Sequence, residues 1–221
     1  MNAYRKLLAL LASIIVTATL SAAPFAVTHA YGDPCTATRS VGVDIVERTT
    51  TAGAFLGKSV VQTFFAEDTL IGAITMWRAN SQPVNGIRLE IDETDSTGMP
   101  LTDRPLLVWP VVLTMPADST ADSTSPTEYR YEFNPPFAVP RRDTFAVNFI
   151  SDPCIDIFDL HVAKDTPSVG GSLWLTSRFG CGRRTFPIHH PELDLCLKVE
   201  FCDTVTPTRP FTWGRLKLRY R

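Results

Sequence analysis

Hydrophobic and polar residues alternate with a period of two along much of the chain. The pattern is clearest in residues 193–202 (LDLCLKVEFC), where apolar side chains occupy every second position and polar ones such as Asp194 and Glu200 fall between them. Residues 87–92 and 129–133 alternate in the same way. Successive side chains of a β-strand point to opposite faces of the sheet, so this spacing predicts strands with one buried and one solvated face.

Ten segments of this kind are short, rich in β-branched or aromatic residues, and separated by turn-forming residues. They cover residues 41–48, 58–66, 69–79, 85–93, 105–115, 128–134, 144–151, 155–163, 172–179 and 193–202. No segment of about 10–15 residues with helical periodicity lies between them, so parallel βαβ units are not expected. The chain is therefore predicted to be all-β, a two-sheet antiparallel β-sandwich of the jelly-roll type.

The first thirty residues have the layout of a secretory signal peptide. Two basic residues precede an uncharged stretch from Leu7 to Leu20, and Thr28 and Ala30 fit the positions three and one before a cleavage site. We expect a signal peptide over residues 1–30, the alternative being an uncleaved N-terminal anchor. The protein is then secreted, periplasmic or on the cell surface, with no membrane span after cleavage, because no later apolar run approaches the roughly 18 residues of a span.

The rest of the chain divides into a predicted β-sandwich domain over residues 31–203 and a linker with a basic C-terminal tail over residues 204–221. A Ser, Thr and Asp-rich run over residues 115–128 is expected to be a long loop within the domain. The 221 residues are 44% hydrophobic and 20% charged, as in ordinary globular proteins. Lys plus Arg (21) nearly balances Asp plus Glu (23), so no nucleic-acid partner is expected. The oligomeric state stays open.

The mature chain is expected to carry disulfides. Its five cysteines are Cys35, Cys154, Cys181, Cys196 and Cys202. Export favours disulfide formation, and two bridges with one free thiol can be arranged in fifteen ways. Cys196 and Cys202 lie six residues apart on one predicted strand, about 20 Å, too far to bond each other. We expect Cys154 to pair with Cys181, and Cys35 to join the last strand.

Four stretches within residues 59–201 occur in an order that resembles a β-sandwich module of secreted bacterial proteins, of the carbohydrate-binding or galactose-binding-like jelly-roll kind. They are SVVQTFFAEDTLIGAITMW, RLEIDETDSTGMPL, YRYEFNPPFAVPRRDTFAVNFIS and SLWLTSRFGCGRRTFPIHHPELDLCLKVEF. In the third stretch a strand ends at Asn134 before Pro135 and Pro136. The resemblance implies the sandwich fold, although residues 141–143 are Arg-Arg-Asp where such modules usually carry a glycine.

The tail resembles the WGxxKxxYR-like endings of some secreted proteins through Trp213, Gly214, Lys217, Tyr220 and Arg221. Basic residues at every second position from 215 to 221 give a strand-like segment with a basic face. Such a segment suits recognition by an export or attachment system, or contact with an anionic surface. The alternative is a frayed terminus or an added edge strand.

Two groups of residues offer ligands for metal ions. Asp92, Glu93 and Asp95 precede a glycine and resemble a weak calcium site, but the EF-hand spacing is absent and the same residue types favour a tight turn. The histidines at 161 and 189–190 lack zinc-site spacing and are expected to be ordinary surface residues. We therefore expect no metal and no cofactor.

No motif of nucleophilic catalysis occurs in the chain. Carboxylates on polar strand faces are candidates for a glycosidase pair, namely Glu90, Asp92, Asp194 and Glu200. Side chains in such positions are usually just solvated. We expect no catalytic residues and no enzymatic activity, with an extracellular hydrolase as the least favoured alternative.

Two tryptophans are candidates for stacking on a sugar ring. Trp77 and Trp174 are out of phase with the apolar positions around them, so either could face solvent, the alternative being that both belong to the core of the second sheet or to a covered face. Arg178, Arg183 and Arg184 flank the hairpin of Trp174 and suit acidic sugars. We predict an exported, non-catalytic β-sandwich for binding or cell-surface architecture, with a glycan or cell-surface partner. The alternative is a structural or protein-interaction domain delivered by its tail.

Overall fold

The computed structural model describes part of the 221-residue chain. The described residues are 25–30, 35–55, 59–79, 84–109, 113–115, 126–151, 157–164, 171–176, 178–179, 183–184 and 187–202. The predicted linker and tail, most of the predicted loop, and the first 24 residues of the predicted signal peptide lie outside them. Among the described residues, no helix has the length and hydrophobicity that a transmembrane helix requires.

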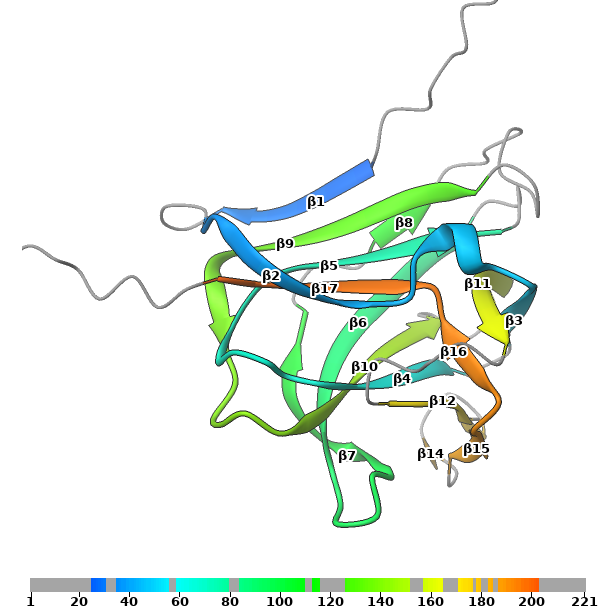
Figure 1. The fold of residues 1–221 in the computed structure, drawn as a ribbon. Coiled ribbons are helices and arrows are strands. Elements are labelled where there is room, and N and C mark those ends of the chain that lie inside the picture. Colours follow the sequence, from blue (N-terminus) through cyan, green and yellow to red (C-terminus); the bar gives the residue numbers. More distant parts are fainter. Residues whose placement is uncertain are drawn as a thin grey trace, which may run out of the picture.

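The strands form two sheets that face each other (Figure 1). The eight-stranded sheet contains β1 (Phe25–Ala30), β2 (Ala37–Gly42), β3 (Thr50–Phe55), β5 (Leu70–Arg78), β9 (Thr127–Ala138), β11 (Ile157–Lys164), β16 (Leu193–Leu195) and β17 (Leu197–Cys202). The seven-stranded sheet contains β4 (Ser59–Phe65), β6 (Val84–Thr94), β7 (Pro100–Val108), β8 (Leu113–Met115), β10 (Thr144–Ser151), β12 (Leu173–Thr176) and β15 (Ile188–His190). A small hairpin adds β13 (Arg178–Phe179) and β14 (Arg183–Arg184).

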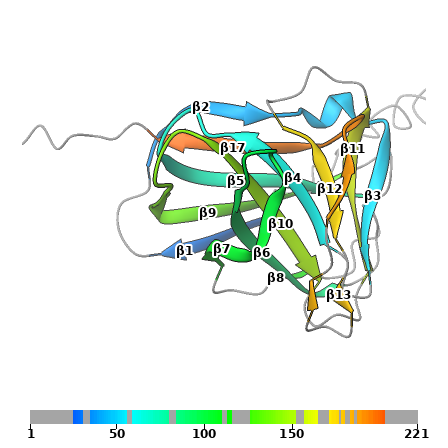
Figure 2. The same cartoon turned by 90° about the horizontal axis from the view of Figure 1, so that it is seen from below.

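The eight-stranded sheet runs in the order β1-β9-β5-β11-β16, with β17 between β5 and β2, and with β3 on β11. The seven-stranded sheet runs in the order β15-β12-β4-β10-β6-β7, with β8 on β6. Figure 2 shows strands of the seven-stranded sheet crossing in front of those of the other sheet. Neighbouring strands of the described chain are antiparallel, except that β1 is parallel to β9. The predicted two-sheet sandwich is confirmed, while the jelly-roll connection stays a prediction.

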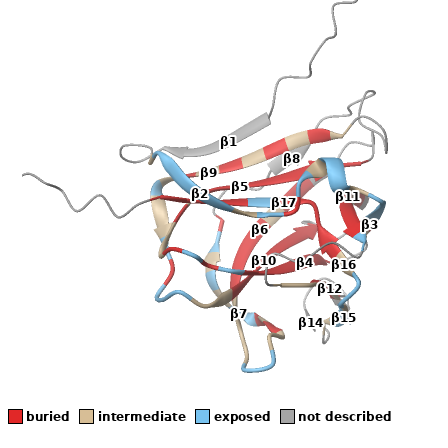
Figure 3. Cartoon of the chain, viewed as in Figure 1, coloured by how far each residue is buried: buried red, intermediate tan, exposed pale blue. Residues whose placement is uncertain are grey.

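The core consists of the alternate residues that point between the sheets (Figure 3). Ile74 on β5 and Leu89 on β6 are fully buried, and each such side chain contributes roughly 1.5–3 kcal/mol of transfer free energy. Trp109 meets Phe133 edge to face, with ring centroids 4.8 Å apart, and Tyr131 at 6.2 Å. Edge-to-face pairs add about 0.5–1.5 kcal/mol beyond burial. The alternation that predicted the strands therefore also predicts the core.

The strand expected over residues 41–48 is wrong. Strand β2 ends at Gly42, and the chain turns into a short 3-10 helix, η2 (Ile45–Glu47). Gly42 has a φ of 153°, and a side chain there would collide with the Leu197 backbone of β17. The Asp44 carboxylate then accepts a hydrogen bond from the Val46 N–H at 3.0 Å, which caps the helix. These local interactions outweigh the strand preference of the apolar residues.

The last predicted strand is divided at Cys196. Leu195 pairs with β11, whereas Leu197 and the residues after it pair with β5. The expected solvated face is also wrong in part, because Asp194 and Glu200 are buried. Both carboxylates are instead satisfied within the protein, as described below.

Strand β9 runs further than predicted. The sequence indicated an end at Asn134, but the strand continues through Pro135 and Pro136 to Ala138. Its register with β5 shifts between Ile71 and Ala73. A register shift of this kind lets a strand accommodate prolines, which cannot donate to the ladder.

The disulfide between Cys35 and Cys202 confirms that Cys35 joins the last strand. Its Cα atoms are 5.8 Å apart, and the bond ties the start of the described domain to its final strand. Gly72 on β5 leaves the space that the two sulfur atoms fill, since a Cβ at this position would collide with both. Cys196 is a free, buried thiol. The expected Cys154–Cys181 pair lies outside the described residues.

Candidate functional site

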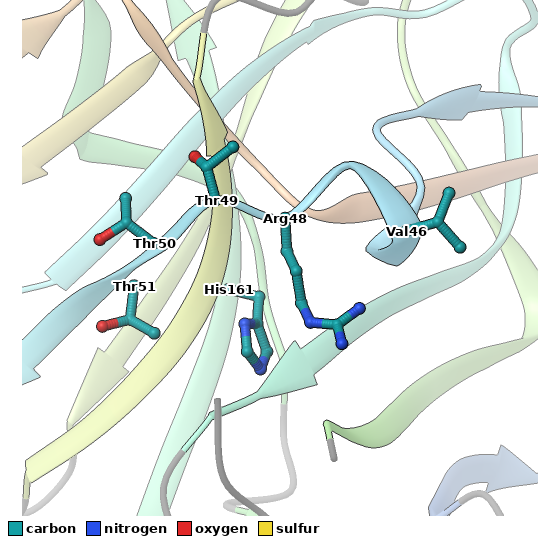
Figure 4. A pocket seen from close by; sticks show the side chains of 6 residues that line it. All are labelled: Val46, Arg48, Thr49, Thr50, Thr51 and His161. Atoms are coloured by element: carbon teal, nitrogen blue, oxygen red, sulfur yellow. The ribbon is translucent and has the colours of Figure 1, made fainter. Parts of the chain in front are cut away.

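A polar pocket of about 310 Å³ lies beside strand β3. Its lining, shown in Figure 4, defines what we call the β3 pocket: Val46, Arg48, Thr49, Thr50, Thr51 and His161. Small-molecule pockets in proteins span about 300–1,000 Å³, so this one suits a ligand of monosaccharide size.

Strand pairing brings the two sides of the β3 pocket together. Strand β3 is antiparallel to β11, with Thr51 opposite His161 and Thr50 opposite Val162. The Thr49 N–H extends the pairing by donating to the Val162 carbonyl at 2.8 Å. Directly opposite residues point to the same face of a sheet, so the Thr51 hydroxyl and the His161 ring lie together on the outer face.

The end of helix η2 positions Arg48. Its backbone N–H and its side-chain Nη1 both donate to the Ile45 carbonyl, at 3.2 and 3.1 Å. The side chain therefore folds back over the helix end and lies beside the ring of His161 (Figure 4). The guanidinium is partly buried, whereas Val46 at the rim of the pocket is 73% exposed.

His161 is the buried wall of the β3 pocket. The residue is only 1% exposed, and its carbonyl accepts a hydrogen bond from the Cys196 N–H at 2.9 Å. Cys196 belongs to a small apolar cluster with Val43, Trp77 and Ala163, on which Ile45 packs. Burial raises the pKa of the Cys196 thiol to about 12 despite the nearby Arg48 cation. The layer behind His161 is therefore apolar, and its Cys196 thiol is neutral near pH 7.

Trp77 does not face solvent, and the alternative of a covered face is confirmed. The ring is 9% exposed because Val43 and Ile45 cover it on the outer face of β5. It borders a smaller pocket of about 150 Å³ between β2, β17 and the residues before η2. Trp77 does lie on the outer face of β5, as its place in the alternation indicated. That face is covered by Val43 and by Ile45 of η2 instead of being exposed to solvent.

Trp174 does not face solvent either, since the residue is 8% exposed, so burial is confirmed here too. It stacks on His189 with ring centroids 4.1 Å apart and an angle of 16° between the planes, and it packs against Val61 and Ala146. His189 in turn shares a 2.8 Å hydrogen bond with the Ser172 hydroxyl. One face of the indole is thus already occupied by a side chain of the same protein.

The three arginines proposed beside Trp174 are placed only by their backbones. Arg178 lies opposite Arg184 in the β13–β14 hairpin, and Phe179 lies opposite Arg183. Their side chains lie outside the described residues. Their role in binding an acidic sugar stays a prediction.

The candidate calcium ligands occupy different environments. Asp95 forms the predicted turn, in which its Oδ1 accepts from the Thr97 N–H, the Thr97 hydroxyl and the Met99 N–H at 2.6–3.0 Å. These hydrogen bonds, that from the Thr97 hydroxyl first, lower the pKa of Asp95. Asp92 is buried on β6 and accepts from Asn148 Nδ2 at 3.1 Å, while Glu93 is partly buried. In the described part of the chain no three His, Cys, Asp or Glu residues form a metal-binding group.

The four carboxylates considered for catalysis each hold a structural contact. Glu90 pairs with Arg88 Nε at 3.2 Å, and Asp92 binds Asn148 as above. Asp194 accepts from the buried Gln62 amide at 2.9 Å. Glu200 pairs with Lys198 at 2.6 Å and with Arg130. Burial acts to raise the pKa of Glu200, but hydrogen bonds from Lys198 and Arg130 outweigh it and lower the pKa.

Sequence reasoning missed Arg48 as a ligand-binding candidate and treated His161 as a surface residue. The two residues are far apart in the chain, and only the β3–β11 pairing brings them together. One signal was present in the sequence, namely three consecutive threonines directly after an arginine.

Comparison with known proteins identifies no family for the chain. The sequence matches no family model and no curated protein. A solved structure that it resembles is "The crystal structure of the cysteine protease and lectin-like domains of Cwp84, a surface layer associated protein of Clostridium difficile", with a TM-score of 0.45 and 11% identity. The match covers 69% of this chain and only 36% of that chain. A likeness of this extent assigns no ligand.

Proposed function

We propose that the protein is an exported, non-catalytic β-sandwich that binds a glycan on the outside of the cell, in the β3 pocket. The observation that carries this proposal is the composition of the pocket. Three threonines, Arg48 and His161 line one concavity beside β3, with Thr51 and His161 on the outer face of the sheet. Hydroxyl groups both donate and accept, as the hydroxyls of a sugar require.

Two further observations support export and contact-only binding. The Cys35–Cys202 disulfide fits an oxidising compartment outside the cytoplasm. None of the six residues lining the β3 pocket is a carboxylate, whereas most glycosidases hold two of them about 5–10 Å apart. A site without such a pair suits binding better than hydrolysis.

A glycan array tests the proposal with residues 31–221 and three variants. We expect the wild type to retain a defined set of glycans, and Thr50→Val together with Thr51→Val to lose most of that signal. The Trp174→Ala variant separates the two candidate sites. If this variant loses glycan binding and the threonine variant does not, the binding site lies at Trp174 on the seven-stranded sheet. Absence of any glycan signal from the folded wild type contradicts the proposal.

A further inference from the structure

We propose that the ligand of the β3 pocket is an acidic monosaccharide unit, whose carboxylate lies at Arg48 and His161 and whose ring hydroxyls face the threonines. This inference rests on the proposed glycan-binding function and adds the charge of the ligand to it.

Arg48 supplies the cationic part of the site. A guanidinium presents a planar fork of N–H donors that matches both oxygens of a carboxylate. Its Nη1 already donates to the Ile45 carbonyl at 3.1 Å. The side chain is therefore ordered before a ligand arrives, so less rotamer entropy is lost on binding.

His161 lies beside this guanidinium on a second element. Its backbone is held by the β3–β11 pairing and by the Cys196 N–H, and the residue is only 1% exposed, so close packing restricts the ring in the wall of the pocket. An imidazole donates a hydrogen bond from at least one ring nitrogen. A carboxylate at this end of the pocket therefore meets donors from two directions.

The charges around the β3 pocket favour a single carboxylate. Among the described residues that line the pocket none is acidic. Asp44 and Glu47 lie on the exposed side of η2, next to the segment that carries Arg48. Their negative charge weakens the attraction for any anion, and weakens it more for a doubly charged group such as phosphate than for a carboxylate.

The threonines of the pocket suit the neutral part of a sugar. Thr49, Thr50 and Thr51 are exposed lining residues with hydroxyl groups, and Thr51 shares the outer face of the sheet with His161. The exposed Val46 lies on the other side of Arg48 from these threonines (Figure 4), so the threonines and not Val46 would contact the sugar ring. A sugar acid combines these two chemistries within one monosaccharide, whereas a simple carboxylate uses only the first.

Isothermal titration calorimetry of residues 31–221 tests this assignment with D-glucuronate, D-galacturonate, their neutral counterparts D-glucose and D-galactose, and acetate. We expect at least one acidic sugar to bind at least tenfold more tightly than its neutral counterpart and than acetate. Arg48→Gln should remove this preference, and Arg48→Lys should keep part of it. Arg104→Gln, at a 74% exposed side chain far along the chain, is the matched control and should behave as wild type.

The outcomes separate the two proposals. Equal affinity for acidic and neutral sugars, or binding of neutral glycans alone on the array, overturns the acidic ligand and leaves glycan binding intact. Acetate binding as tightly as the sugar acids shows a plain anion site and overturns the assignment of a sugar. Circular dichroism and the unfolding midpoint of each variant exclude loss of fold as the cause, and His161→Gln provides a second variant in the same pocket.

Discussion

Gln62 on β4 hydrogen-bonds Asp194 and Leu195 on β16, so one buried amide joins the two sheets. Its Nε2 donates to Asp194 Oδ1 at 2.9 Å, and its Oε1 accepts from the Leu195 N–H at 2.7 Å. Gln62 is fully buried, and it occupies a position where the strand pattern would place an apolar residue. Both polar groups of the amide are therefore used to attach the β16 edge to the seven-stranded sheet.

Replacing Gln62 with Leu should lower the free energy of unfolding by about 2 kcal/mol or more, because the Leu195 N–H and the Asp194 carboxylate each lose a partner. Urea unfolding measures the effect. Phe65→Ser on the same strand is the control, since Phe65 is 44% exposed and should change the free energy by less than about 0.5 kcal/mol. Equal effects of the two substitutions would show that the amide contributes nothing.

The buried hydroxyls of Tyr129 and Tyr131 predict opposite effects of the same substitution. The Tyr131 hydroxyl is buried in the core without a hydrogen-bond partner, and burial raises its pKa. The Tyr129 hydroxyl accepts from Arg78 Nη1 at 3.5 Å. Tyr131→Phe should therefore raise the free energy of unfolding by about 1 kcal/mol, while Tyr129→Phe should lower it. Thermal unfolding of both variants decides this, and a lower midpoint for Tyr131→Phe contradicts it.

The pattern within each strand located the buried face. On β6, Ile87, Leu89 and Ile91 are all fully buried, as their spacing indicated, but the expected solvated face is wrong, because Glu90 and Asp92 are buried as well. The predictions failed where a distant segment covers a face. Trp77 is buried because η2 folds over it, and no periodicity within β5 reports a segment thirty residues earlier in the chain.

The candidate site was less predictable than the fold for the same physical reason. The β3 pocket depends on the register that sets Thr51 opposite His161, and a register between strands distant in sequence is not encoded in either strand alone. The sequence left fifteen arrangements of the cysteines open, so the expected pairing of Cys35 with the last strand did not distinguish Cys196 from Cys202. The selection of Cys202 reflects the gap above Gly72.

Removing the disulfide should destabilise the domain. The bond joins two residues that are 167 positions apart in the sequence. Native disulfides stabilise small secreted domains by roughly 2–5 kcal/mol. The double variant Cys35→Ser/Cys202→Ser should unfold at a lower guanidinium concentration, and wild type treated with a reductant should behave in the same way. An unchanged midpoint, or a peptide map that joins Cys35 to another cysteine, contradicts the assignment.

Cys196 should be unreactive in the folded protein. Its pKa is raised from 9.0 to about 12 by burial, so at pH 8 the thiol is neutral as well as covered. Iodoacetamide should leave the Cys196 peptide unmodified in buffer and label it in guanidinium. Labelling at equal rates in both conditions contradicts the burial of the thiol.

The same thiol predicts a pH dependence of stability. The folded state keeps the proton up to about pH 12, whereas the unfolded chain releases it above about pH 9. The stabilisation is therefore complete below pH 9 and is lost between pH 9 and 12. Cys196→Ala should show a shallower decline of unfolding free energy over this range than wild type.

The pairing of β1 with β9 predicts that hydrogen exchange in β9 differs between the protein with residues 25–30 and the protein without them. Residues Phe25–Ala30 pair in parallel with Tyr129–Asn134 of β9, and they lie inside the predicted signal peptide. Cleavage after Ala30 therefore leaves β9 as an edge strand. Hydrogen exchange over residues 129–134 should be faster in a chain starting at Tyr31 than in one starting at Pro24, and equal exchange contradicts the pairing.

Chemical-shift mapping on isotopically labelled residues 31–221 tests the β3 pocket most directly. On addition of D-glucuronate we expect the largest amide shifts at Arg48, Thr49–Thr51 and His161, with little change around Trp174 and His189. Shifts confined to the Trp174 hairpin, or their absence at Arg48 and His161 under saturating ligand, would contradict the assignment of this pocket as the binding site.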